Sequence, residues 1–343
     1  MYYKQALIGI ESNFDSFPIK ELQRLGYPNL YIREREDKFS GIMEKSYGFR
    51  TTSVTRPVII SNLVKIVRDT VELINDSDAF LLGIENMSIN MPIYFNIDEI
   101  GLISEKLYKK KKKLFISLNK NMHNKDLKEL ERILTILNDL KIEGVFYYDV
   151  AILSIVRRLK LDLKLVWSSE HLTTNYATIN FWKDMKIDYT YLSAEITLDE
   201  IIEISKNTSV KLIVPIFGYL PIFASMRHTV KNYLNRFNLK DNSKINYLNL
   251  KDDYHPIVDD NLGTNIYSAH ILNGYQEYLK LKNYQIDYVT LNAFDIDDEK
   301  FTKVVKMFKE GKQESEEKIN EMFENTSKGF LYKETIYRVK KND

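Results

Sequence analysis

Short apolar runs alternate with segments of helical periodicity along most of the chain. Ten runs have the length and the β-branched or aromatic content of buried strands. They are residues 6–10, 30–33, 58–60, 79–83, 114–119, 144–149, 163–169, 189–193, 212–216 and 288–291. Repeated alternation of strands and helices predicts a parallel sheet, and the number of units favours a TIM-barrel-like (β/α) barrel over an open sheet.

Two helical segments carry clear sequence signals. Residues 197–205 begin with a Thr-x-x-Glu capping box, which predicts a helix starting after Thr197 with Glu200 in its first turn. Residues 126–140 have helical periodicity, and their apolar side chains share one face. That face consists of Leu127, Leu130, Ile133, Leu134 and Leu137.

The alternation is interrupted in three places, which define the expected domains. Residues 1–55 form an N-terminal extension of unknown role, and residues 56–294 form the barrel. A β-rich segment is inserted after residue 228, where alternation over residues 245–250 predicts a strand that can belong to a hairpin. Residues 295–343 are a charged helical appendage that we expect to end in a strand at residues 329–339.

Composition limits the chemistry more than it limits the fold. The 343 residues are 44% hydrophobic, and 49 basic against 48 acidic residues leave a net charge of +1. The net charge therefore produces no overall electrostatic field that attracts nucleic acid, although a local basic patch would be enough to bind it. The chain has no cysteine, which excludes disulfides, thiolate zinc sites, thiol nucleophiles and a four-cysteine [4Fe–4S] cluster.

The N-terminus has neither the apolar core nor the cleavage site of a signal peptide. Apolar runs stay shorter than the roughly 18 residues of a membrane span. We therefore expect a cytoplasmic protein.

Polar side chains follow several predicted strands, at the end where a barrel binds ligands. The ligand-binding candidates are Asn119, His123, Ser169, Glu170, Glu195, Arg227 and His228. The planar fork of Arg227 suits a carboxylate or phosphate, and the alternative is an internal ion pair with Glu170 or Glu195. The histidines are dispersed, and neither HExxH nor G-x-S-x-G occurs, so no metal ligands or catalytic residues are predicted.

Residues 211–233 carry a family resemblance. After a strand, Gly218, Leu220, Arg227, Asn232 and Tyr233 match the signature of the peptidase U32 family. The two cysteines of that signature fall on Pro221 and His228. Further segments that resemble the family, in the same order, are residues 79–83, 114–124, 167–175, 255–265 and 329–339.

The resemblance implies the function of a family member that lacks the cysteines of the cluster. Members of this family resemble hydroxylation factors that hold a [4Fe–4S] cluster on four cysteines, and this chain resembles a cysteine-less type found beside a cysteine-bearing paralogue. It implies an accessory subunit in prephenate-dependent hydroxylation of tRNA wobble uridine, with no intrinsic cofactor. The implied partners are a U32 paralogue, tRNA and a prephenate-like anion. Two alternatives stay open, a peptidase such as a collagenase-like hydrolase, and a non-catalytic barrel that binds an anion or RNA.

Overall fold

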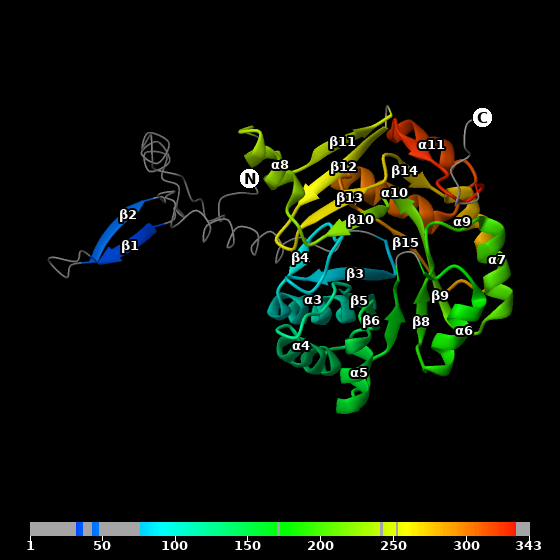
Figure 1. The fold of residues 1–343 in the computed structure, drawn as a ribbon, viewed down its shortest axis with the longest axis horizontal. Coiled ribbons are helices and arrows are strands. Elements are labelled where there is room, and N and C mark those ends of the chain that lie inside the picture. The colour runs from blue at the N-terminus through cyan, green and yellow to red at the C-terminus, as the bar shows by residue number, and fades with distance from the viewer. Residues whose placement is uncertain are drawn as a thin grey trace, which may run out of the picture. The chain divides into compact units, whose positions relative to one another are not determined.

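A parallel sheet forms the centre of the larger of two compact units, Met1–Ile74 and Asn75–Asp343. The computed structural model describes residues 32–36, 43–47, 76–169, 172–240, 243–251 and 253–333. Along the sheet, each strand is parallel to its neighbour (Figure 1). The order is β3 (Ala79–Ile84), β5 (Lys113–Leu118), β6 (Gly144–Tyr147), β7 (Leu165–Trp167), β8 (Tyr189–Tyr191), β9 (Lys211–Gly218) and β15 (Tyr288–Leu291).

Short strands extend this sheet at both sides. β4 (Tyr94–Phe95) pairs with the end of β3, and β14 (Ile271–Asn273) pairs antiparallel with the end of β9. β16 (Thr326–Ser327) then pairs with β14. A closed barrel requires pairing between β15 and β3, which is not found in the described part of the chain. The parallel α/β architecture is confirmed, and closure of the barrel is not.

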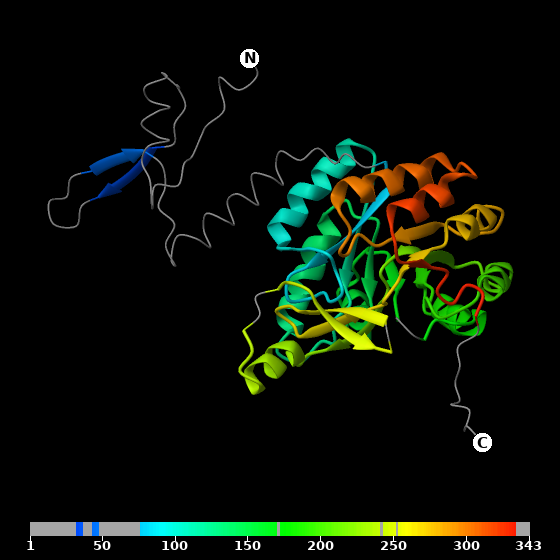
Figure 2. The ribbon, with the colours of Figure 1, turned by 90° about the horizontal axis from the view of Figure 1, so that it is seen from above.

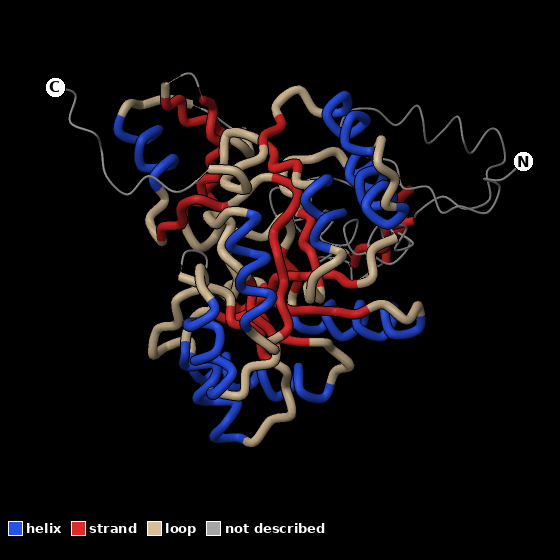
Figure 3. Tube along the Cα trace, turned by 90° about the vertical axis from the view of Figure 1, so that its right-hand side faces the viewer, coloured by secondary structure: helices blue, strands red, loops and turns tan. Residues whose placement is uncertain are grey.

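Helices lie on the outside of the strands (Figure 3). Five follow strands of the sheet, and three more belong to the C-terminal third. These are α3 (Ile97–Lys109), α4 (Leu127–Asp139), α5 (Val150–Leu159), α6 (Tyr176–Asp184), α7 (Leu198–Asn207), α9 (Tyr275–Leu281), α10 (Asp298–Glu310) and α11 (Ser315–Met322). The predicted capping box at Thr197 and Glu200 is present at the start of α7. α4 buries four of the five apolar residues of its predicted face. In the part of the chain described, no helix has the length and apolar character to cross a membrane.

The inner face of the sheet is filled by aromatic and aliphatic side chains. Phe115 of β5 lies edge-on to Phe146 of β6 and to Tyr189 of β8, with ring centroids 5.7 Å apart in both pairs. Tyr288 of β15 reaches the same cluster, 5.4 Å from the ring of Phe115. Side chains from both sides of the gap between β3 and β15 therefore share one interior.

The β-rich insertion forms a separate antiparallel sheet with the order β10–β13–β12–β11. Its strands are β10 (Pro221–Ser225), β11 (Asn246–Leu250), β12 (Asp253–Asp259) and β13 (Thr264–Tyr267), and α8 (Thr229–Arg236) follows β10. The predicted strand at residues 245–250 is confirmed as β11, in a hairpin with β12. Tyr267 of β13 stacks on Phe294 with ring centroids 3.7 Å apart, which fixes the insertion to the α/β body.

The smaller unit is described only where β1 (Ile32–Glu36) and β2 (Met43–Tyr47) form an antiparallel hairpin. The strands predicted at residues 6–10 and 58–60 lie outside the described residues. The strand predicted at residues 329–339 is wrong where it can be compared, because residues 329–333 form a turn. Gly329 has a φ of +52°, a left-handed conformation that does not fit a strand.

Candidate functional site

A cavity of 510 Å³ lies where the parallel strands end, between the α/β body and the inserted sheet. Asn119, Lys120 and Asn121 follow β5, and Ser168 and Ser169 follow β7. Residues 223–226 of the insertion form the opposite wall. The ligand face predicted for a barrel is therefore a hollow with polar groups at its base and an inserted sheet above it.

Asn119 organises the loop that follows β3. Its Oδ1 accepts a hydrogen bond from the Ile89 amide at 2.9 Å, and its Nδ2 donates to the Ile89 carbonyl at 3.1 Å. Both polar ends of the Asn119 side chain are thus engaged by backbone. Asn119 lines the cavity as predicted, and its amide shapes the wall.

Lys120 is a buried cation that sequence reasoning missed. It is 6% exposed, and its ammonium donates to the Asn86 carbonyl at 2.6 Å and pairs with Asp126 at 3.2 Å. Burial alone would raise the pKa of Asp126, but the His123 amide and the Lys120 ammonium outweigh burial and lower it. A single lysine after a strand gives no sequence signal of burial, because lysine is usually exposed.

Ser168 and Ser169 place two hydroxyl groups at the base of the cavity, with exposures of 8% and 1%. A serine nucleophile needs a neighbouring base. The described residues that line the cavity include no histidine, aspartate or glutamate. Glu170 and His171, which follow in the sequence, lie outside the described residues. The described wall can bind a polar ligand through hydroxyl, amide and ammonium groups.

Asp260 fastens the inserted sheet over the cavity. Its Oδ2 accepts hydrogen bonds from the Tyr94 hydroxyl and from the Asn265 side chain, each at 2.9 Å. Its Oδ1 accepts from the amides of Leu262 and Gly263, at 2.7 and 3.1 Å. The family-like segment at residues 255–265 therefore acts as a structural clamp.

Arg227 and His228 lie beyond the cavity, between β10 and α8. The Arg227 side chain is exposed and is not among the residues that line the cavity. The Thr264 hydroxyl donates a hydrogen bond to the Arg227 carbonyl at 2.7 Å. The same hydroxyl accepts a hydrogen bond from the Thr229 amide at 2.7 Å. In the described part of the chain, Arg227 forms no ion pair, so the alternative of a pair with Glu195 is not seen.

The remaining candidates are dispersed. His123 is exposed and contacts Asp126 through its backbone: its amide donates to the Asp126 carboxylate at 2.9 Å, and its carbonyl accepts from the Asp126 amide at 2.8 Å. Glu195 is half-buried, and its amide donates to the Ser193 hydroxyl at 3.2 Å. The structure thus brings together Asn119 and Ser169 at the cavity. The candidates outside its lining are His123, Glu195, Arg227 and His228.

The positions that correspond to the family cysteines do not form a cluster site. Pro221 opens β10, and His228 precedes α8 as a cap residue without a side-chain cap hydrogen bond. With no thiolate in the chain, the residues present do not fit a [4Fe–4S] cluster. Among the described residues, histidine, aspartate and glutamate side chains form no group of three able to hold a metal ion.

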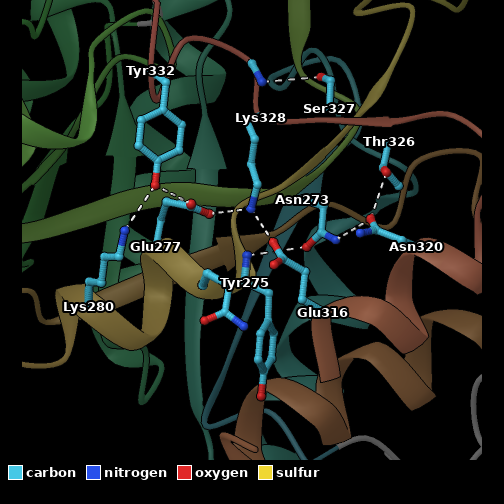
Figure 4. A network of polar contacts seen from close by, with 12 residues as sticks. Asn273, Tyr275, Glu277, Lys280, Glu316, Asn320, Thr326, Ser327, Lys328 and Tyr332 are labelled. Carbon is cyan, nitrogen blue, oxygen red and sulfur yellow. Dashed lines mark hydrogen bonds and ion pairs between the residues drawn. The ribbon is translucent and has the colours of Figure 1, made fainter. Parts of the chain in front are cut away.

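A second polar network joins the C-terminal segment to α9 (Figure 4). Glu277 of α9 is 2% exposed and accepts hydrogen bonds from Lys328 at 2.8 Å and from Tyr332 at 2.7 Å. Lys328 also pairs with Glu316 of α11. Every member has a partner within the network and none lines the cavity, so its role is structural.

Comparisons with known proteins agree with the resemblance in the sequence. A family model described as peptidase family U32 matches residues 70–339. tRNA hydroxylation protein P2 of Bacillus subtilis (strain 168) is 26% identical over 284 residues, which are 76% of this chain and 92% of that protein. tRNA hydroxylation protein P1 of the same organism is 26% identical over 140 residues, which are 41% of this chain.

This chain thus matches only 33% of the length of protein P1, so the similarity to P1 is confined to a part of that protein. Among solved structures, a U32 peptidase is similar with a TM-score of 0.36 and 17% identity. That similarity covers 44% of this chain and 65% of the other.

Proposed function

The chain belongs to peptidase family U32, and from this premise we propose that it takes part in tRNA hydroxylation as a subunit without an iron–sulfur cluster. The observation that carries the proposal is the similarity to tRNA hydroxylation protein P2, which spans 92% of that protein. The family match includes the whole parallel sheet, the cavity and the inserted sheet. The similarity therefore extends over the elements that build the candidate site.

The proposal assigns no redox step to this chain. Without cysteines it cannot hold a four-thiolate cluster, so a cysteine-bearing U32 paralogue would supply that centre. Two U32-like proteins named for tRNA hydroxylation, P1 and P2, occur together in Bacillus subtilis, which is consistent with a pair of subunits. The target we propose is the wobble uridine of tRNA, converted to a 5-hydroxyuridine-type nucleoside.

For the cavity we propose a small anionic metabolite, such as a prephenate-like dicarboxylate. Hydroxyl groups of Ser168 and Ser169 and the amide of Asn121 offer hydrogen bonds at its wall. The Lys120 ammonium lends positive charge, which its pair with Asp126 partly offsets. Leu172 and Phe223, both exposed and apolar, offer contact to the carbon skeleton of the ligand.

The test is nucleoside mass spectrometry of total tRNA from the source organism with and without the gene. We expect hydroxylated uridines to disappear on deletion and to return with the wild-type gene. Ala224→Trp, which places a ring at the exposed cavity wall, should fail to restore them. Ala177→Trp, at an exposed position on α6, is the matched control and should restore them.

Two results contradict the proposal. One is an unchanged set of modified uridines in the deletion strain. The other is cleavage of protein substrates by the purified chain, abolished by a single substitution at Ser168 or Ser169, which would favour the peptidase hypothesis.

A further inference from the structure

Residues 226–251 are rich in positive charge, in a chain whose basic and acidic residues are balanced overall. Residues 226–251 contain six lysines and arginines and one acidic residue, Asp241, whereas the whole chain has a net charge of +1. The six are Arg227, Lys231, Arg236, Lys240, Lys244 and Lys251. Among the described residues, none of them forms an ion pair, although eleven lysines and arginines elsewhere do.

Exposed aromatic rings lie among these cations. α8 has no buried residue, and Tyr233 and Phe237 are 58% and 59% exposed, with ring centroids 4.8 Å apart. Tyr233 lies on α8 and Phe237 is its C-cap residue, while Arg236 is the last residue of the helix and Lys240 follows it in the chain. We call Arg227, Lys231, Tyr233, Arg236, Phe237 and Lys240 the α8 patch. Two rings on a helix that buries nothing are available to a partner.

The N-terminal end of α8 is held by the ends of β12 and β13 in the inserted sheet. Asp259 accepts a hydrogen bond from the Lys231 amide at 2.9 Å, at the first turn of α8. The Thr264 hydroxyl accepts a hydrogen bond from the Thr229 amide at 2.7 Å. α8 projects from the inserted sheet, away from α3 (Figures 1 and 2). Asp259 thus places a negative charge at the N-terminal end of α8, where the helix dipole favours it.

The α8 patch is continuous with the mouth of the cavity. Ser225 and Met226 line the cavity, and Arg227 follows directly in the chain. Met226 is 53% exposed, and the exposed rings of Phe223 and Tyr148 also line the mouth. A polymer held on the α8 patch would therefore pass close to this apolar rim.

We propose that the α8 patch binds a single-stranded segment of RNA and leads one of its nucleotides to the cavity. This inference rests on the proposed function, because it names the surface that would recognise tRNA. Proteins bind single strands with cations that follow the phosphates and aromatic rings that stack on bases. The cores of protein–protein interfaces, in contrast, are depleted in lysine. Unpaired cations interspersed with paired rings favour RNA as the occupant.

The experiment measures binding of the purified full-length chain to a fluorescent single-stranded anticodon stem–loop RNA by anisotropy. Arg236→Glu with Lys240→Glu should weaken binding at least tenfold and reduce the slope of log K against log salt by about 0.7 per lost phosphate contact. Tyr233→Ala with Phe237→Ala should weaken binding roughly fivefold to a hundredfold, with the slope unchanged, because stacking is lost and charge is not.

Matched controls keep the result specific. Lys183→Glu with Lys303→Glu reverses two exposed lysines on α6 and α10 and should leave binding unchanged. All variants should melt at the wild-type temperature, because the substituted side chains are exposed.

Three outcomes overturn the inference. They are failure of the wild-type chain to bind the RNA, wild-type affinity in both α8 variants, and α8 variants that bind RNA but lose a co-purifying protein. The last would identify the patch as a protein interface.

The same variants, placed in the deletion strain, separate this inference from the proposed function. If hydroxylated uridines depend on the gene but persist with both α8 variants, the inference fails and the proposed function stands. If they do not depend on the gene at all, the proposed function fails.

Discussion

The hydroxyl group of Tyr94 donates a hydrogen bond to Oδ2 of Asp260 at 2.9 Å, across 166 positions of sequence. Tyr94 lies in β4 of the parallel sheet, and Asp260 follows β12 of the inserted sheet. Burial, followed by the negative charge of Asp260, raises the pKa of Tyr94, so it stays a donor at neutral pH. This contact holds the two walls of the candidate site together.

Tyr94→Phe should therefore loosen the inserted sheet. We expect a loss of about 1–3 kcal/mol in the free energy of unfolding, since a hydrogen bond to a carboxylate is removed. Urea denaturation measures the change. Tyr176→Phe, at a residue 40% exposed at the start of α6, is the control and should change stability by less than about 0.5 kcal/mol. Equal stability of the two variants would contradict a clamping role.

Gly263 cannot accept a side chain without movement of β10. Its φ is +142°, and a Cβ there would lie 1.9 Å from the Ser225 carbonyl oxygen. Gly263→Ala should destabilise the protein by more than about 1 kcal/mol and displace residues 225–226 at the cavity wall. Gly101→Ala on α3 meets no atom within 4 Å and should stabilise by about 0.5–1 kcal/mol. Thermal melting of both variants tests the contrast, and a neutral Gly263→Ala would disprove it.

Two buried tyrosines should respond oppositely to loss of their hydroxyl groups. Tyr147 is fully buried, and its hydroxyl has no hydrogen-bond partner among the residues that the structure describes. Tyr147→Phe should be neutral or stabilise the fold, because an unpaired polar group is removed. The Tyr275 hydroxyl lies 3.0 Å from the Met307 carbonyl oxygen and 2.8 Å from that of Lys312. Tyr275→Phe should cost about 1–2 kcal/mol in denaturant unfolding, and a larger loss for Tyr147→Phe would reverse the interpretation.

The Glu277 network should make stability depend on acid pH. Burial by itself would raise the pKa of Glu277, but hydrogen bonds from Lys328 and Tyr332 outweigh burial and lower it. A carboxylate with a lowered pKa in the folded state stabilises the fold above its unfolded pKa of about 4.3. That contribution is lost as the pH falls through the folded pKa.

Glu277→Gln should thus cost about 1–3 kcal/mol at pH 7, and the difference from wild type should shrink below about pH 4. Urea denaturation at several pH values measures it. Glu299→Gln, at an exposed residue of α10, is the control. A difference that stays constant from pH 7 to pH 3 would show that the Glu277 charge does not contribute.

Local patterns predicted the elements whose boundaries depend on neighbouring residues. The strand predicted at residues 288–291 matches β15, and the capping box at Thr197 forms because both partners lie within one helical turn. The apolar face of α4 is buried because its spacing presents a continuous stripe to the sheet. The turn at residues 329–333 was missed because a short apolar run does not show whether the segment forms a strand or a turn packed against its neighbours.

The candidate site depended more on contacts between distant segments. Asn119 and Ser169 reach the cavity because parallel strands end at one edge. Arg227 follows β10 in the inserted sheet and therefore lies beyond the cavity. Its position in the sequence did not indicate this. Lys120 was missed because its burial depends on Asp126 and on a carbonyl group 34 residues away.

The sequence by itself determined the parallel α/β architecture, the U32 resemblance and the exclusion of a four-thiolate cluster, because these follow from local periodicity, ordered motifs and the lack of cysteine. Only the tertiary structure decided which polar groups share a cavity and which form hydrogen bonds that hold the fold together. The amide of Asn119 is engaged by Ile89, and Asp260 is engaged by Tyr94. Hydrogen bonds between distant segments settle such roles, and the order of residues along the chain does not encode them directly.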